Sequence, residues 1–428
     1  MSKKLIVALC LIFVAGFLVF STDSQAMPNF ARKYGADCSM CHTVIPKLNK
    51  LGYEFRLAGY RLPSEIGKEE KPFNLGDFFT ARFQEQFKYQ NHSDVKPGKD
   101  FTSSQLEFFE FTMYPLTGSW GKYFASIGEF SMAPDDVFEV ENAYIRGVYG
   151  DDNGWFQARI GIMHPWEGFG ASDRPIGNTR PLFQKVAAVG SPFFLWNLDE
   201  SALEAGYHFA KSGTTISARI SNGILWKEDG SGTAEPAQGG GLTKGKNTPG
   251  WNDKNYQVFL NQFITQDAAV SLYYYYGAVP FPDPNYEFTT STTRDTFQRF
   301  AAYANYWVLP NKINLLAGYA YGHDSLKDST VKSSDGKYNG SKVGNSQGYF
   351  GEVDFHATPK LAFGARYDFY DPSKKVDHNN QNAITISGSY YIWHGLQFIA
   401  DYQHKEVEQT AGGKNKDDQL MARLIFIW

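Results

Sequence analysis

Cysteine is scarce in this chain. Its 428 residues include three cysteines, and Cys10 lies in an apolar N-terminal stretch, which leaves Cys38 and Cys41 for the rest of the chain. Two cysteines this close together cannot provide the disulfide framework that small secreted domains use. The fold must therefore depend on hydrogen bonds and packing.

Long apolar runs and a strong charge of one sign are also lacking. Beyond the N-terminal stretch the sequence contains no run of about twenty apolar residues, so we predict no transmembrane helix. The formal net charge is −4, and nothing in its distribution indicates a nucleic-acid partner. We also find no Gly-rich phosphate loop and no nucleophile–base arrangement that stands out.

Aromatic residues and glycine are plentiful instead. The chain has 26 Tyr, 35 Phe, 9 Trp and 41 Gly. Aromatic side chains favour strands and glycine favours turns, so this composition indicates many strands and few helices.

Residues 1–26 have the pattern of a secretory signal. Lys3 and Lys4 form a charged start, residues 5–20 are apolar, and residues 24–26 are a small-x-small cleavage site. We expect the mature chain to begin at Met27 and to be exported.

Residues 38–42 read Cys-Ser-Met-Cys-His, which is the attachment pattern of a c-type haem. Cys38 and Cys41 are expected to add to the two vinyl groups, and His42 is the expected proximal iron ligand. The alternatives are a redox cysteine pair, half of a zinc site or a chance match. A zinc site needs four ligands, and the chain has no second cysteine pair. We therefore predict one covalent haem c.

The motif lies in a short segment, residues 27–62, that we predict to be helical. Pro28 suits the first turn of a helix over residues 29–34, which Gly35 would end. Apolar residues at three- and four-residue steps from 44 to 58 predict a second helix of about fifteen residues. Four basic residues can pair with haem propionates or form a solvated face: Arg32, Lys33, Arg56 and Arg61.

Residues 63–75 are rich in proline and charge and are expected to form a linker. From residue 76 to 428 the apolar residues recur at every second position. In residues 361–370 and 384–392, for example, one face is apolar and aromatic while the other is polar or small. This period predicts strands, either of a soluble sandwich or of a membrane barrel with a wet lumen.

The connections between the expected strands favour the membrane barrel. About sixteen strands are expected to begin near residues 77, 103, 123, 137, 155, 201, 214, 255, 268, 295, 313, 348, 361, 382, 396 and 417. Tight turns are expected at residues 117–122, 150–154, 211–213, 265–267, 310–312, 359–360 and 394–395, and long connections alternate with them. Outer-membrane barrels have short periplasmic turns and long outer loops, whereas a sandwich has no reason to sort its connections.

The alternation slips in the strands expected near residues 77, 103 and 255, which makes these the weakest assignments.

The final stretch places apolar side chains on one face and ends on the aromatic Trp428. This ending is similar to the C-terminal strand signature of outer-membrane barrels. Pairing of the last strand with the first would remove an exposed apolar edge. The expected fold is therefore an all-β transmembrane barrel of about 16 antiparallel strands with a small N-terminal haem segment.

Residues 30–35, the motif at 38–42, and residues 46–60 together resemble the fused monohaem cytochrome–porin family of bacterial outer membranes, of the single-chain iron-oxidising type. The resemblance covers the layout of the whole chain and carries over Cys38, Cys41 and His42. It implies electron transfer across the outer membrane, often from extracellular ferrous iron, to periplasmic c-type cytochromes. The chain would then lie in outer-membrane lipid with the haem segment entering from the periplasmic side. We expect the haem in or at the barrel lumen, because a haem below a hydrocarbon core about 30 Å thick would leave most of that distance without a redox centre.

The sixth iron ligand is left open by the sequence. The candidates are Met27 and three residues expected on the polar, lumen-facing set: Met163, His208 and His356. His164, His323 and His394 lie at strand ends or in turns, where a structural or solvent-facing role is expected. Acidic residues near the polar faces can attract ferrous ions or remain solvated: Glu129, Glu139, Glu141, Glu204, Glu352 and Asp354.

Two other functions are compatible with the sequence. One is a porin whose haem-bearing segment only regulates solute passage, which rings of one charge sign in the pore would favour. The other is a soluble periplasmic cytochrome with a β-rich domain. No catalytic residue is predicted, and enzymatic activity is limited to possible oxidation of iron(II).

Overall fold

A computed structural model describes the protein over most of its length. The described residues are 28–36, 38–44, 47–69, 75–134, 139–164, 175–189, 200–222, 225–228, 234–237, 254–280, 294–325, 342–393, 395–409 and 412–427. Within this part of the chain, no helix has the length and apolar character needed to cross a membrane.

Short elements precede and interrupt a series of long strands. The N-terminal elements are α2 (Pro28–Tyr34), η1 (Cys38–Met40), β1 (His42–Val44), β2 (Lys47–Leu48), α3 (Lys50–Leu57), η2 (Pro63–Glu65) and η3 (Leu75–Phe78). The strands that follow are β3 (Thr80–Ser93), β4 (Phe101–Tyr114), β5 (Gly118–Trp120), β6 (Phe124–Met132), β7 (Glu139–Asp151), β8 (Gly154–Met163), β9 (Glu200–Phe209), β10 (Thr214–Ser221), β13 (Asn255–Phe263), β14 (Ala268–Pro280), β15 (Arg294–Leu309), β16 (Ile313–Asp324), β17 (Asn345–Thr358), β18 (Leu361–Asp371), β19 (Gln381–Trp393), β20 (Leu396–Glu408) and β21 (Lys414–Ile427). A short helix, α4 (Leu182–Lys185), lies between β8 and β9, and the hairpin of β11 (Leu225–Glu228) and β12 (Ala234–Ala237) lies between β10 and β13.

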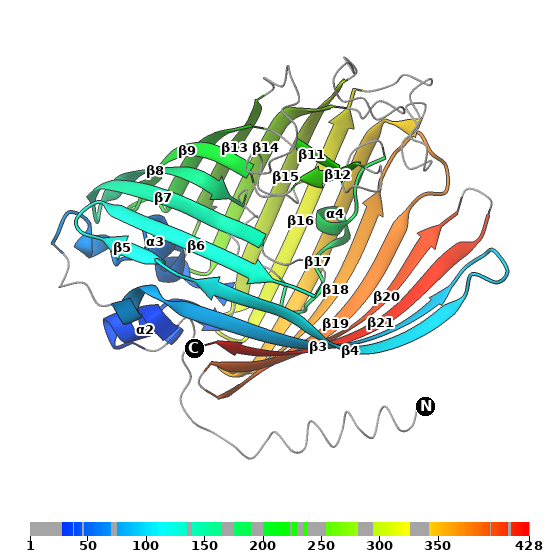
Figure 1. Ribbon diagram of the computed structural model, residues 1–428, viewed down its shortest axis with the longest axis horizontal. Coiled ribbons are helices and arrows are strands. Elements are labelled where there is room, and N and C mark those ends of the chain that lie inside the picture. The colour runs from blue at the N-terminus through cyan, green and yellow to red at the C-terminus, as the bar shows by residue number, and fades with distance from the viewer. Residues whose placement is uncertain are drawn as a thin grey trace.

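The long strands form one closed antiparallel barrel (Figure 1). Neighbours in the chain are neighbours in the sheet, and β21 pairs with β3 to close it. Sixteen of the strands are long, and β5, with three residues, is an extra short strand beside β6. The expected barrel of about sixteen strands is confirmed, and each expected start lies within about three residues of a described strand.

Side chains of the barrel are arranged inside out compared with a soluble protein. In β10 the polar residues Thr215, Ser217 and Arg219 are buried, while Ile216 and Ile220 are exposed. The same alternation in the other strands leaves a large apolar and aromatic outer surface. A surface of this kind suits lipid and would be an aggregation hazard in water, so the wall has the character of a membrane barrel.

The two ends of the barrel differ. The connections at one end are short, and we call it the short-turn end; examples are residues 152–153, 210–213, 264–267 and 310–312. The longer connections lie at the opposite end, which we call the long-loop end. Figure 1 shows α2 and α3 at the short-turn end.

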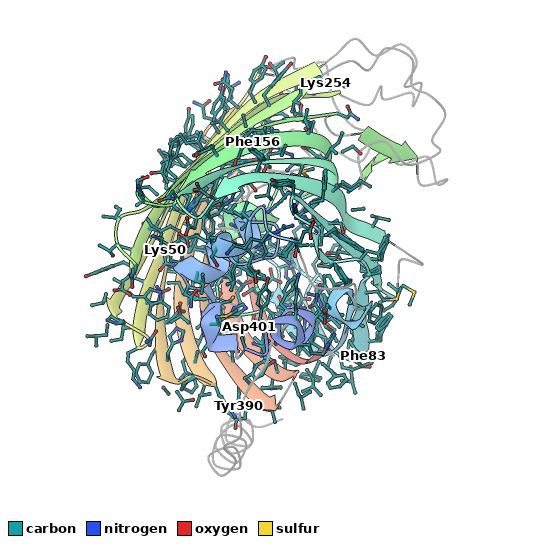
Figure 2. The ribbon with its side chains drawn as sticks, turned by 90° about the vertical axis from the view of Figure 1, so that its left-hand side faces the viewer. Lys50, Phe83, Phe156, Lys254, Tyr390 and Asp401 are labelled. Atoms are coloured by element: carbon teal, nitrogen blue, oxygen red, sulfur yellow. The ribbon has the colours of Figure 1, made fainter. Side chains whose placement is uncertain are left out.

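The N-terminal segment, residues 28–69, lies inside the barrel at the short-turn end, and we call it the plug. Its β2 contributes Lys47, whose ammonium binds Asp354 and lies 3.0 Å from Asn314 Oδ1 on the inner wall. Its α3 contributes Tyr53, whose hydroxyl is 3.3 Å from Thr215 Oγ1. Figure 2 looks into this end and shows the ribbon of the plug within the ring of strands.

A second segment enters the lumen from the connection between β8 and β9. Residues 175–189 contact the inner faces of β17 to β20, where Ile176 N donates to Glu352 Oε1 at 3.1 Å and Asn178 N donates to Asp401 Oδ1 at 2.9 Å. Phe183 of α4 packs on Phe350 with ring centroids 5.7 Å apart. This segment, expected only as an outer loop, narrows the lumen from within.

The plug differs in part from the sequence-based expectation. The helix α2 and its end at Gly35, which has a φ of 56°, are as predicted. The second helix is shorter than the fifteen residues expected, because residues 42–44 and 47–48 pair as β1 and β2 and α3 begins after Asn49. The proline at position 46 explains this difference, since it lacks an amide hydrogen and disfavours helix in the residue before it. The expected linker begins with a 3-10 helix, and Ile66 is buried.

Candidate functional site

The plug is fixed to the barrel wall by side chains at both of its ends. The guanidinium of Arg61 donates to the carbonyls of Gly121, at 2.8 Å, and Lys122, at 2.7 Å, in the turn before β6. At the other end Asn29 Nδ2 donates to Thr117 O at 3.2 Å, and its Oδ1 accepts from Thr80 Oγ1 at 2.8 Å. Both Asn29 and Arg61 are buried, so the plug is part of the folded interior.

Three basic side chains of the plug bind the barrel chain: Arg32, Lys33 and Arg61. The two roles expected from the sequence, pairing with haem propionates and a solvated face, did not include this one. Arg32 donates to Gly76 O at 2.7 Å, and Lys33 Nζ donates to Ser119 Oγ at 2.7 Å. Lys33, like Arg61, anchors the plug to the barrel, whereas Arg32 is exposed, as a solvated face predicts, and holds the chain just before β3. Arg56 contributes its carbonyl, which accepts from the guanidinium of Arg146 on β7.

Asn49 organises the Cys-x-x-Cys-His loop. Its Oδ1 accepts from Gly52 N at 2.9 Å and so caps the first turn of α3. Its Nδ2 donates in the opposite direction to Met40 O at 3.0 Å, and its backbone N donates to Cys41 O at 2.9 Å. One side chain therefore ties the motif to the start of α3. Sequence reasoning missed this role, although an Asn just before a helical stretch is a common capping signal.

Gly52 lets α3 approach the motif closely. A Cβ at this position would lie 2.1 Å from Cys41 O and 2.8 Å from Leu48 Cδ2. A side chain would therefore push the helix away from the second motif cysteine. The close approach fixes the position of Cys41 against the helix.

Cys41 packs against an aromatic cluster in the plug. Phe30 stacks on Tyr60 with centroids 5.3 Å apart and meets Phe55 edge-on at 5.3 Å. Tyr34 meets the other side of Phe55 at 5.6 Å. The Cys41 side chain and Ala125 of the wall complete this cluster. Burial raises the pKa of the Cys41 thiol to about 11.

The other two motif residues are described less fully. Cys38 begins the short helix η1, and its side chain lies outside the described part of the chain. His42 begins β1, pairs with Leu48 of β2 and is partly buried. The motif is therefore one compact turn between α2 and the β1–β2 hairpin.

The plug and wall also meet through a pair of tyrosines. The hydroxyls of Tyr60 and Tyr144 are 3.0 Å apart. The guanidinium groups of Arg146 and Arg159 lie 5.6 Å and 5.2 Å from the Tyr144 ring centroid. Burial beside Tyr144 raises the pKa of Tyr60 far above the ordinary range, so its hydroxyl stays protonated. The sequence did not single out either tyrosine.

Three of the candidate ligands for an iron face the lumen. Met163 is fully buried with Tyr144 and Ala202, and Ile127 packs against both this group and the cluster that holds Cys41. His208 lies against the plug, with Nδ1 2.9 Å from Thr215 Oγ1 and Nε2 3.5 Å from Glu54 Oε1.

His356 is buried against Trp307, with ring centroids 4.9 Å apart, two residues after Asp354 on the same face of β17. Among the described residues neither of its ring nitrogens has a hydrogen-bond partner. The fourth candidate, Met27, lies outside the described residues.

Three of the six acidic residues singled out from the sequence form ion pairs with Arg or Lys. Glu204 accepts from Arg159 at 2.9 Å and 2.7 Å, and Glu352 lies 3.5 Å from Arg366. Asp354 binds Lys47 of the plug. The inner wall thus carries both charge signs, rather than the rings of one sign that a selective pore would favour.

Glu129 and Glu141 face each other, and His164 joins them. The side chain of Glu139 lies outside the described part of the chain. His164 was expected to be structural or solvent-facing, yet the fold brings it to these two carboxylates. His323 is 2.6 Å from Asn345 Oδ1 across the β16–β17 pair, and His394 lies outside the described residues.

Comparisons with known proteins place the fold. No protein-family model matches the chain, and no curated protein matches it in sequence. Solved structures do match. An anion-selective porin from Comamonas acidovorans has 11% identity and a TM-score of 0.52, with 82% of this chain and 98% of that chain covered. OprB from Pseudomonas putida has 12% identity and a TM-score of 0.51, with 81% and 94% covered.

A third match is OmpF from Salmonella typhi in complex with daunomycin, at 11% identity and a TM-score of 0.50, with 82% and 97% covered. Identities this low say nothing about substrates. The fold of the matched porins does agree with the closed wall described above and its apolar outer surface. The chain therefore has the barrel fold of outer-membrane porins, and this fold is consistent with a bacterial outer-membrane location.

Proposed function

We propose that this protein transfers electrons across the bacterial outer membrane through one covalent haem c held by the plug. Cys38 and Cys41 would form the thioether bonds, and His42 would provide the proximal imidazole. The short-turn end would face the periplasm and its c-type cytochromes, and the long-loop end would face an extracellular redox partner such as iron(II).

The observation that carries this proposal is the place of the plug inside the lumen. The hydrocarbon core of a bilayer is about 30 Å thick. A redox centre below the barrel would leave an electron most of that distance to cross in one step. A motif within the wall divides the distance into two shorter steps. The plug is bound to the wall by buried contacts, which suits a fixed redox centre.

The residues around the motif suit a porphyrin. Cys41 packs on a cluster of four aromatic rings, which is the kind of apolar surface that a haem plane requires. Asn49 and Gly52 hold the motif backbone against α3, so the thiol has a defined position. When bound, the haem would supply reversible one-electron transfer. The protein would bind it, orient it and exclude water.

Met163 is the sixth ligand that the packing favours. Ile127 contacts both its group and the Cys41 cluster. His208 instead lies 3.5 Å from Glu54 of α3, and His356 is two residues from Asp354, which binds Lys47 of β2. A thioether ligand raises the haem potential relative to an imidazole. We expect Met163→His to lower the midpoint potential and to alter the absorption spectrum, with His356→Gln as the matched control. An unchanged spectrum in M163H would exclude Met163.

The proposal is tested first on detergent-extracted membranes. A haem-stained gel of boiled and unboiled samples should give one haem-positive band whose mobility shifts on boiling, as closed barrels do. The double variant Cys38→Ala/Cys41→Ala should keep the shift and lose the stain. Purified protein in liposomes should then pass electrons from an outside reductant to an enclosed acceptor. Haem-loaded protein that passes none would refute the conduit.

A channel role is the second candidate, and the porin-like fold is the observation that favours it. The plug and residues 175–189 both occupy the lumen, which opposes free passage of solutes. Conductance measurements on the full chain and on a variant without the plug separate the two roles.

A further inference from the structure

Glu129, Glu141 and His164 form a cluster of possible metal ligands in the lumen. One ligand atom from each of the three side chains lies within 4.8 Å of the others. Glu129 comes from β6, Glu141 from β7, and His164 directly follows β8, so three consecutive strands build the cluster. Two carboxylates and an imidazole form a mixed oxygen and nitrogen donor set, which suits divalent transition metals.

An irregularity in the sheet turns Glu141 toward this cluster. Glu129 pairs with Asn142 while Phe130 pairs with Val140, so Glu141 is an extra residue in β7. A bulge of this kind changes the face to which a side chain points and is frequent beside functional sites. Without it, Glu141 would alternate away from the side chain of Asn142. The bulge is therefore what brings two carboxylates from neighbouring strands together.

Asn142 supports the cluster from outside. Its Nδ2 donates to Glu129 Oε2 at 2.6 Å, and its Oδ1 accepts from His164 N at 3.1 Å. Tyr114 donates its hydroxyl to Glu129 Oε1 at 2.9 Å. Each carboxylate oxygen retains a second lone pair for a metal. Ligands held by such outer hydrogen bonds are typical of metal sites.

The cluster is reachable and differs from the other acidic groups. The side chains of His164 and Glu141 are 39% and 21% exposed, so an ion in the lumen can reach them. Arg82, whose guanidinium pairs with Glu110 at 2.6 Å, also interacts electrostatically with Glu129 and Glu141. Glu204, Glu352 and Asp354 are instead buried and paired with cations. Glu129 and Glu141 share Arg82 with Glu110, so three carboxylates face one guanidinium, and a divalent cation would balance the remaining negative charge.

The cluster lies between the long-loop end and the plug. It is within three residues of the ends of β6, β7 and β8 on that side. Tyr144 and Ile127 pair two residues further into the barrel, about 7 Å along the strands. Tyr144 contacts Tyr60 of the plug, and Ile127 packs on the cluster that holds Cys41.

We propose that Glu129, Glu141 and His164 bind a divalent transition metal ion in the lumen, and that this is the entry site for iron(II). The binding role stands by itself. The entry role rests on the proposed function: the bound iron(II) loses one electron and becomes iron(III), and ferric haem c takes up that electron. The open coordination positions would let the product ion leave.

Metal binding is tested with Mn²⁺, which does not reduce haem. Full-length detergent-purified protein is titrated with Mn²⁺, and free ion is measured by electron paramagnetic resonance. We expect one saturable site that is weakened tenfold or more in Glu141→Gln and in His164→Gln. Asn142→Ala should weaken it by about tenfold as an outer-shell change. Glu107→Gln is the control, because Glu107 lies on β4 outside the cluster and accepts a hydrogen bond from Gln86 at 2.9 Å.

The heat shift on gels shows that each variant has a closed barrel, and rapid mixing with iron(II) gives the rate of haem reduction. The absence of saturable Mn²⁺ binding, or equal binding in both ligand variants, would overturn the site. Native Mn²⁺ binding together with unchanged haem reduction in the ligand variants would overturn its entry role. Saturable Mn²⁺ binding in protein that carries no haem would leave the site standing and remove the proposed function.

Discussion

At the residue scale, Asn49 connects three parts of the plug. Its side chain caps α3 and holds the carbonyl of Met40, while its backbone holds Cys41. We expect Asn49→Ala to loosen the motif by about 1–2 kcal/mol, the usual cost of a lost helix cap. Hydrogen–deuterium exchange of residues 38–57 in detergent should accelerate accordingly.

Asn49→Asp is the matched variant. The carboxylate keeps the acceptor for Gly52 N but cannot donate to Met40 O, so it should preserve α3 and loosen only the motif loop. If both variants exchange at the native rate, the side chain of Asn49 does not hold the loop.

Cys41 gives a prediction about pH. Its pKa of about 11, raised by burial, means that the thiolate is rare at pH 8, and thiolate is the form that alkylates. In mature protein made without haem, with Cys38→Ser so that one thiol is left, iodoacetamide should react about a hundredfold more slowly than with the unfolded chain. The folded protein's rate should climb with pH up to about 11. Equal rates at pH 8 would show that Cys41 is exposed.

The sequence singled out the motif residues and two of the cluster's carboxylates, Glu129 and Glu141, but it did not show that His164 joins them. A Cys-x-x-Cys-His pattern is local, so it can be found without a fold. Glu141 reaches Glu129 only because of a bulge, and His164 only because Asn142 holds its backbone. Those effects depend on pairing between strands, and a period-two pattern assigns a side chain to one face without showing such slips.

At the scale of elements, the β1–β2 hairpin depends on a buried pair with β17. Lys47 and Asp354 are almost fully buried, and Lys47 also binds Asn314. Lys47→Met would leave the Asp354 carboxylate buried without its cation, at a cost of about 3–5 kcal/mol. Exchange of residues 42–48 should increase strongly.

Lys47→Met with Asp354→Asn should recover much of that stability, because no buried charge is left. A double variant as unstable as Lys47→Met would show that the pair acts through shape and not through charge.

Elements were predicted well where the pattern was regular. The strands from β14 to β21 begin within about three residues of their expected positions, because each alternates over nine residues or more. Strand β13 also begins at the expected residue 255, although the sequence alternation slips there. The slip near β3 and β4 is a register irregularity between Gln84 and Glu85. The second helix was predicted too long. The apolar period was right, but the prediction did not take into account the proline at 46 and the helix cap at Asn49. Here the proline and the helix cap, and not the spacing of the apolar residues, determined where the helix begins.

At the scale of the whole molecule, the plug should set the permeability. In planar bilayers we expect the full chain to give small conductance steps or none, since the plug and residues 175–189 share the lumen. Deletion of residues 28–69 should give larger steps. The deletion variant must still show the heat shift that marks a closed barrel. Equal conductance in both proteins would mean that the plug does not obstruct the pore, and would favour the channel role.

The inward path of residues 175–189 was beyond sequence reasoning. Its contacts with Glu352, Asp368 and Asp401 join positions more than 170 residues apart. The number and order of the barrel strands were accessible, because their signal is a repeat. The entry of residues 175–189 into the lumen was not, because it depends on long-range polar contacts that no repeat encodes.

The closure of β21 onto β3 has a consequence for the timing of biogenesis. The plug precedes β3 in the chain, so it leaves the export machinery before any strand, and the last strand arrives at the end. Once that seam is made, the motif loop is enclosed. Under the proposed function, an attachment enzyme must act on the cysteines before the seam forms. Biogenesis would then require two maturation pathways, for the cofactor and for the wall, to run in a fixed sequence.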